Sequence, residues 1–61
     1  MRILIVNNET EEIIETIEDA TSAQVAAYTV ADVIKIPGSK LLVDSIVVDH
    51  YFQDIHILVH E

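Results

Sequence analysis

The sequence predicts a small α+β domain with the element order β-α-(α)-β-β, in which one helical layer covers a three-stranded sheet and the chain ends in a C-terminal β-hairpin. Two patterns predict this class. The first half places apolar residues at helical spacing within an acidic segment, and the second half is rich in Val, Ile and Leu. The 61 residues allow a single domain over 1–61, and a hydrophobic fraction of 51% is too high for a disordered chain.

A strand and then a helix are predicted for the first twenty residues. Residues 3–6 form a continuous apolar run, which is typical of a strand covered on both faces. Asn8 can cap a helix, with Glu11 at the position that completes a capping box. A helix over residues 9–20 would bury a stripe of apolar side chains, namely Ile13, Ile14, Ile17 and Ala20.

The next segment, residues 23–36, admits two interpretations. Thr21 and Gln24 have the spacing of a second capping box, and the alanines that follow favour a helix reaching about Lys35. The many β-branched residues in the same segment favour a strand instead. Residues 37–38, Pro-Gly, end the element in either case because Pro disfavours helix before it and Gly suits a tight turn.

The last third of the chain predicts the β-hairpin. Residues 40–51 are dense in Val, Ile and Leu, and residues 54–60 alternate, with Ile55, Ile57 and Val59 on one side. We expect the turn between the two strands near residues 52–54.

A homodimer is expected because a three-stranded sheet with one helical layer leaves its second face uncovered. Four apolar side chains left in water would forgo roughly 6–12 kcal/mol, which is comparable with the whole stability of a small domain. The mean hydropathy of +0.38 agrees with an apolar excess. The predicted dimer interface consists of Leu41, Val43, Val47 and Tyr51.

The excess of acidic residues predicts a second binding surface, in addition to the dimer interface. Eleven acidic residues against three basic ones give a net charge of −8, which disfavours direct binding to nucleic acid or to an anionic membrane. Carboxylates spaced along a helix resemble a row of phosphates and would suit a basic groove on another protein. The alternative is a solvated surface that keeps an apolar dimer in solution. The candidate partner-binding residues are Glu11, Glu12, Glu15, Glu18 and Asp19.

Other chemistry finds little support in the sequence. The chain has no Cys, and its single Gly excludes a Gly-rich phosphate loop. His50, His56 and His60 match no strong metal-binding signature, so we expect neither a metal nor another cofactor. Without a signal peptide or an apolar run of about 20 residues, the chain is predicted to be cytoplasmic.

Together these observations predict a small acidic protein that is not an enzyme, forms a homodimer and binds a basic protein. In size and charge it is similar to inhibitors made by phages and mobile elements, which suggests a nucleic-acid-mimicking helix as the binding surface. The alternative hypothesis is a structural oligomerisation or assembly module that acts through the apolar sheet face. Charge reversals on the acidic segment would damage the first function, and acidic substitutions of Val47 or Tyr51 the second.

Overall fold

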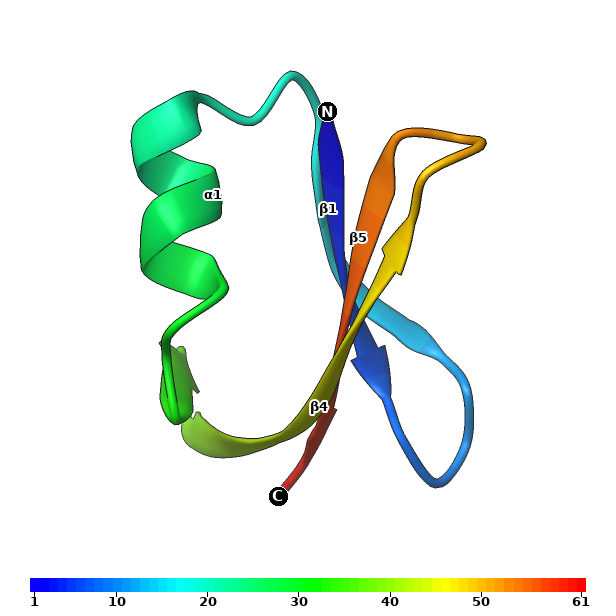
Figure 1. Cartoon of the computed structure of the whole chain (residues 1–61). Helices are drawn as coiled ribbons and strands as arrows, with labels where there is room; N and C mark the ends of the chain where they lie inside the picture. Colours follow the sequence, from blue (N-terminus) through cyan, green and yellow to red (C-terminus); the bar gives the residue numbers. More distant parts are fainter.

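The computed structural model describes residues 1–61 as one sheet with a single helix (Figure 1). The strands follow the order β2-β1-β5-β4-β3, with β1 and β5 parallel and all other neighbours antiparallel. The sheet curls into a half-barrel, and α1 lies across its open side. The elements are β1 (Arg2–Asn7), β2 (Ile13–Ile17), α1 (Ser22–Tyr28), β3 (Val33–Ile36), β4 (Ser39–Asp49) and β5 (Asp54–His60).

The predicted fold class was wrong. Strands account for 54% of the residues and helix for 11%, so the protein is predominantly β rather than α+β. The sheet has five strands instead of three, and no helical layer covers it, since α1 has seven residues and none of them is buried.

The predicted helix over residues 9–20 is replaced by a turn and an edge strand. The Asn7 side chain accepts hydrogen bonds from the backbone N–H groups of Glu9 and Thr10, at 2.8 and 3.1 Å, and so reverses the chain. Glu11 continues the reversal with a φ of 64°. Residues 13–17 then pair with β1, where their β-branched side chains are favoured. Isoleucines spaced for a helix also suit this strand, and the side chain of Asn7, rather than that of Asn8, accepts the backbone hydrogen bonds, within a turn instead of a helix cap.

The second capping box was predicted correctly. Thr21 Oγ1 accepts from the Gln24 N–H at 3.1 Å, and Gln24 Oε1 accepts from the Thr21 N–H at 2.9 Å. The helix ends at Tyr28, and the Thr29 hydroxyl donates to the carbonyl of Val25 at 2.7 Å. Neither interpretation of residues 23–36 covers the whole segment, because it holds both the end of α1 and strand β3.

The C-terminal hairpin is confirmed as β4 and β5. Residues 37–38 join β3 to β4 in a tight turn, where Gly38 has a φ of 81°. Within β4 the register with β5 shifts between Val43 and Ser45, so Asp44 is an extra residue and forms a β-bulge. The bulge reverses the side of the sheet to which later residues of β4 point.

The core lies on the concave side of the sheet, beneath α1. Val25 and Tyr28 of the helix pack against it. The predicted alternation in β5 is confirmed, because its three core residues are at most 3% exposed. The buried cluster consists of Ile3, Ile5, Ile34, Leu41, Ile55, Ile57 and Val59. No helix of the fold is long and apolar enough to cross a bilayer.

Candidate interaction surface

The convex side of the sheet, which we call the outer face, carries a broad row of apolar side chains. Cross-strand register places these residues on the side opposite the core, since each lies across from another outer residue. Leu4 and Val6 on β1 are almost fully buried, at 6% and 9% exposure, whereas the outer apolar residues of β2, β3 and β4 are about half exposed. The apolar residues of the outer face are Leu4, Val6, Ile13, Val33, Leu42, Val47 and Leu58.

A hollow of about 330 Å³ lies on the outer face over β1 and β5. Its volume is at the lower end of small-molecule sites. Glu11 and His56 are its only polar lining residues, so it offers an apolar floor with one carboxylate and one imidazole. The other lining residues are Leu4, Val6, Ile13 and Leu58.

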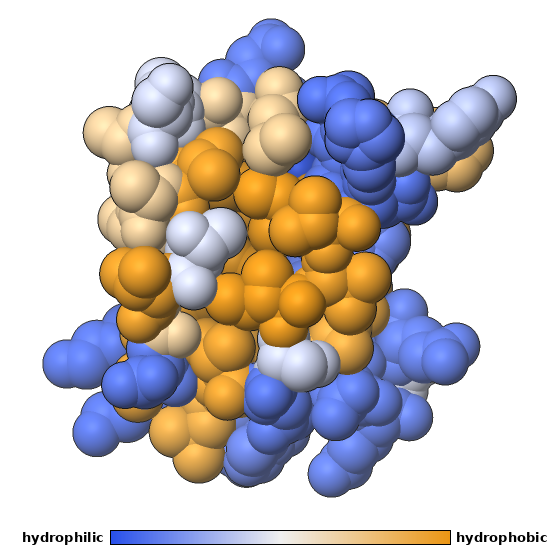
Figure 2. All heavy atoms as spheres, viewed as in Figure 1, coloured by the Kyte–Doolittle hydropathy of each residue, from blue (hydrophilic) through white to orange (hydrophobic).

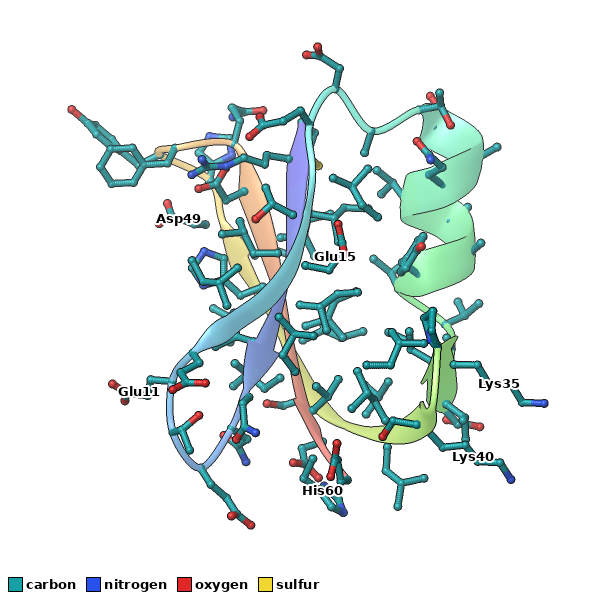
Figure 3. The ribbon with its side chains drawn as sticks, turned by 180° about the vertical axis from the view of Figure 1, so that it is seen from behind. Glu11, Glu15, Lys35, Lys40, Asp49 and His60 are labelled. Carbon is teal, nitrogen blue, oxygen red and sulfur yellow. The ribbon has the colours of Figure 1, made fainter.

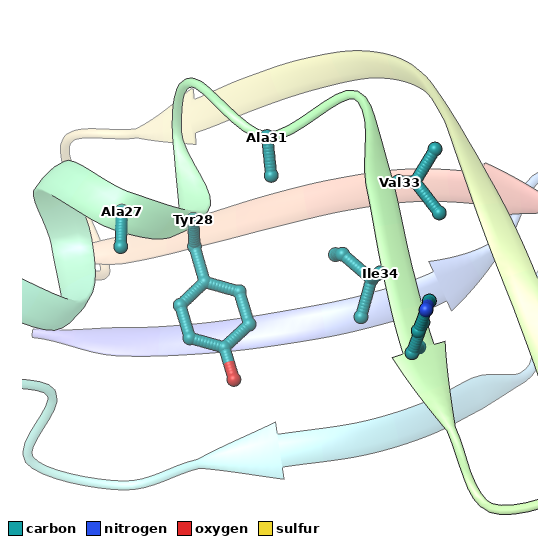
Figure 4. A pocket seen from close by; sticks show the side chains of 6 residues that line it. Ala27, Tyr28, Ala31, Val33 and Ile34 are labelled. Atoms are coloured by element: carbon teal, nitrogen blue, oxygen red, sulfur yellow. The ribbon is translucent and has the colours of Figure 1, made fainter.

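A second hollow, of about 270 Å³, lies between α1 and β3 (Figure 4). The ring of Tyr28 and the methyl groups of Ile34 line this hollow, and Lys35 is its only charged residue. The remaining lining residues are Ala27, Ala31 and Val33.

The core is also incompletely covered between α1 and β4. Figure 2 shows apolar side chains gathered over the middle of this side, with charged side chains at its margins. On β4, Val43 and Ile46 face the core but are only half-buried, and Val48 remains 60% exposed. A seven-residue helix is too short to cover a five-stranded sheet.

The turn between β4 and β5 presents two neighbouring aromatic side chains, which we call the aromatic tip. Tyr51 is 85% exposed and Phe52 is 67% exposed. Their rings pack edge to face, with centroids 4.9 Å apart and an interplanar angle of 84°. Figure 1 shows this turn projecting beyond the body of the sheet.

Hydrogen bonds within the turn hold the aromatic tip in place. The Phe52 N–H donates to Asp49 Oδ1 at 3.1 Å, and the Gln53 side-chain amide donates to the carbonyl of His50 at 2.7 Å. Gln53 adopts a φ of 58°, which closes the turn before β5. The backbone of the turn that carries the two rings is therefore restrained by hydrogen bonds.

Below the aromatic tip, an ion pair joins the starts of β1 and β5. Arg2 Nε and Nη2 donate to the two carboxylate oxygens of Asp54, at 3.0 and 2.8 Å. The hydrogen bond from Arg2 lowers the pKa of the Asp54 carboxyl, and the same bond raises the pKa of Arg2. Asp54 is only 6% exposed, so this bidentate contact satisfies a buried carboxylate at the base of the tip.

A second polar contact lies at the opposite end of the sheet. Asp44, the bulged residue of β4, lies 2.7 Å from His60 Nδ1 through Oδ1 and accepts from the Asn8 side-chain amide at 3.1 Å. His60 is thus engaged by the bulge, while His56 lines the outer hollow and His50 belongs to the tip turn. No three His, Asp or Glu side chains come close enough to hold a metal ion.

The five predicted acidic partner-binding residues are all exposed but do not share one helix face. Glu11 and Glu12 lie in the turn before β2, Glu15 lies on β2, and Glu18 and Asp19 follow it. Glu15 is opposite Ile5 and so points to the core side, at a distance from Glu11 (Figure 3). The acids therefore follow one edge of the sheet.

The four predicted interface residues are dispersed. Leu41 is 1% exposed within the core, Val43 packs on the core, Val47 is 49% exposed on the outer face, and Tyr51 belongs to the aromatic tip. Simple alternation would put all four on one side of the sheet, and the bulge at Asp44 instead places Leu41 and Val43 on the core side and Val47 on the outer face. Phe52 was missed, although consecutive aromatics within a turn are visible in the sequence.

The fold and these surfaces define a small mixed-sheet domain with an exposed aromatic tip and an acidic edge along β2. The chain matches no protein-family model, and no curated protein or solved structure matches it either.

Proposed function

We propose that the protein acts by binding another protein, with the aromatic tip as its anchor. The observation that carries this proposal is the exposure of Tyr51 and Phe52 on a turn that hydrogen bonds keep in one conformation. Exposed aromatic rings present apolar surface to water, binding gains free energy by burying that surface, and aromatic residues dominate the energetics of interfaces. Because the turn is already ordered, little conformational entropy is lost when a partner closes over it.

The partner that fits this tip has an apolar pocket in a positively charged surface. The net charge of −8 would speed encounter with such a surface, and salt would weaken the attraction. The acidic residues of the β2 edge remain candidates for contacts around the anchor. Their proposed role is charge complementarity with a basic protein. They would present this charge from a sheet edge instead of from the helix that the sequence predicted.

The alternative function, an assembly module, is favoured by one further observation. The apolar surface between α1 and β4 is not closed by the chain itself, so a second copy could cover it. In that case association with itself, rather than with a different protein, would be the activity of the molecule.

Capture from an extract of the native host distinguishes these functions. Three immobilised proteins are compared at low and high salt: wild type, Y51S/F52S and the control V30S. Val30 is 78% exposed and is not part of the tip, so V30S removes exposed apolar surface elsewhere. Removing two anchor residues should weaken a partner's affinity by about 30-fold or more.

The expected result is a protein retained by wild type and by V30S but lost with Y51S/F52S. Identical captured proteins for all three variants would contradict a role for the tip. Capture of the chain alone would favour the assembly module.

A further inference from the structure

Strand β3 forms one edge of the sheet, and part of its backbone has no hydrogen-bonding partner. The N–H of Val43 on β4 donates to the carbonyl of Asp32 at 2.9 Å. Because paired residues of an antiparallel ladder alternate, residues 34 and 36 also direct their backbone groups to β4, and Val33 and Lys35 direct theirs outward. No backbone hydrogen bond of a turn or loop uses these outward groups. Two N–H and two C=O groups are therefore open to a further strand.

The hollow between α1 and β3 runs along this same edge (Figure 4). Val33, Ile34 and Lys35 all line it, although successive side chains of a strand point to opposite faces. The hollow therefore follows the rim of the strand, and its other side is formed by Tyr28 and two alanines of α1. Its volume of about 270 Å³ is below the usual range of small-molecule sites, about 300–1,000 Å³. A side chain of an extended segment suits it better than a whole small molecule.

The outer side of the β3 edge is positively charged. Lys35 lies directly opposite Lys40 on β4, and both side chains extend into solvent (Figure 3). Neither lysine takes part in an ion pair, and like charges that face each other across strands are unfavourable. A carboxylate beside Lys35 would relieve this repulsion. Asp32 precedes β3 at the other end of the edge, so the attraction for an acid is greatest near Lys35.

A strand added at this edge would point its side chains alternately to the two sides of the sheet. The residue across from Lys35 would lie on the outer side, as Lys35 does, and its two neighbours would lie on the core side, near Ile34 and Tyr28. The complementary sequence therefore alternates acidic and apolar residues. In β-strand addition, main-chain hydrogen bonds provide affinity and the alternate side chains provide specificity.

We propose that the β3 edge binds an extended segment of another protein, in which acidic and apolar residues alternate, as an additional strand of the five-stranded sheet. The backbone groups of Val33 and Lys35 hold the backbone of the segment. Lys35 and Lys40 attract its carboxylates, and the hollow between α1 and β3 accepts its apolar side chains. This site is distinct from the aromatic tip, because β3 pairs with the start of β4 and the tip follows its end.

An NMR titration of the isotope-labelled protein tests this site. The probe is a synthetic six-residue peptide of alternating Val and Glu, and the control peptide has the same composition with all Glu before all Val. At roughly 0.15 M salt the screening length is about 8 Å, so distant acids of the chain repel the peptide little. The alternating peptide should shift the amide resonances of Val33, Lys35 and the α1 residues of the hollow. It should also slow the exchange of the Val33 and Lys35 amides with solvent.

The control peptide should bind about fivefold or more weakly, since it cannot direct all its acids to one side of the sheet.

Three variants separate the parts of the site. V33P removes an outward N–H but leaves the hydrogen bonds to β4, so it should weaken binding by about tenfold or more, whereas V33T keeps the N–H and should stay within about threefold of wild type. K35E should weaken binding by about fivefold or more, because attraction becomes repulsion. Lys35 is exposed, so K35E keeps the test valid if circular dichroism shows that V33P is unfolded.

Y51S/F52S leaves the β3 edge intact and should bind the peptide like wild type. This variant separates the site from the proposed function of the tip, since either one can fail without the other.

Three results would overturn the proposal. The first is the absence of shifts in β3 at millimolar concentrations of the alternating peptide, or shifts confined to β2 or the tip. The second is binding that neither V33P nor K35E weakens. The third is a shift of the Val33 and Lys35 amides with rising protein concentration in the absence of peptide, because a second copy of the chain would then occupy the edge.

Discussion

The β1–β5 pair and α1 lie on opposite sides of the same core, and different interactions hold them. β1 and β5 run parallel in continuous register, and Ile3, Ile5 and Ile57 between them are at most 2% exposed. In α1 no residue is buried, and hydrogen bonds at Thr21 and Thr29 close its two ends. Burial of apolar side chains therefore stabilises the β1–β5 pair, whereas hydrogen bonds at the two ends of α1 contribute much of the stability of the helix.

This difference separates stability from binding. The aromatic tip, the two edges of the sheet and the open side by α1 lie outside the β1–β5 pair. Substitutions of exposed residues there should change binding with little change in the free energy of unfolding. Substitutions within the β1–β5 pair should do the reverse.

The largest effect is expected for I57A. Ile57 is fully buried in β5 and packs in the middle of the core cluster. Truncation removes apolar contacts and leaves a cavity, so the free energy of unfolding should fall by about 2–5 kcal/mol. Urea denaturation followed by circular dichroism measures the loss.

V25A is the matched substitution on α1. Val25 is half-buried, and Ala has the higher helix propensity, which offsets part of the lost contact, so the cost should stay below about 1 kcal/mol. Equal losses for I57A and V25A would show that α1 is as tightly packed as the central strands.

A smaller effect, visible only in acid, is expected from the Arg2–Asp54 pair at the end of the β1–β5 contact. The pKa of Asp54 is lowered by its hydrogen bond from Arg2, so its carboxylate stabilises the fold fully above the unfolded-state pKa of about 3.9. This contribution declines as the pH falls below that value towards the lowered pKa. The melting temperature of wild type, measured by thermal unfolding, should therefore fall more than that of D54N between neutral and acidic pH.

D49N provides the control, because Asp49 also accepts a hydrogen bond in the tip turn but has no ion pair. The stability of the D49N variant should depend on pH in the same way as the stability of wild type. A D54N variant with the same acid dependence as wild type would assign the pH effect to other carboxylates.

The sequence predicted β1 and β5 as individual strands, and the C-terminal hairpin, because their signals are local, whereas it did not predict that β1 and β5 pair. A continuous apolar run marked residues 3–6, and alternation in residues 54–60 placed Ile55, Ile57 and Val59 on one side. The box at Thr21 and Gln24 was also found, since its two hydrogen bonds lie within four residues. Each of these features depends on neighbours in the chain.

The edges and faces depend on contacts that are distant in sequence. The isoleucines of β2 fit a helix as well as a strand, and pairing with β1 decides between them. Nothing local marked Asp44 as a bulge, yet it places Val43 and Val47 on different sides of the sheet. Of the aromatic tip, Tyr51 was identified as an interface residue only through an alternation that the structure does not keep.

The smallest effect is expected for T21A, which tests whether capping rather than packing defines α1. Losing a capping side chain costs about 0.5–2 kcal/mol, and the lower end applies here because no residue of the helix is buried. Hydrogen exchange of the α1 amides should accelerate while the β1 and β5 amides keep their protection. S22A is the control, since the Ser22 side chain makes none of the capping bonds. If T21A weakened protection in β1 and β5 as strongly as in α1, the helix and the sheet would unfold as one unit, and the contrast between the two regions would not hold.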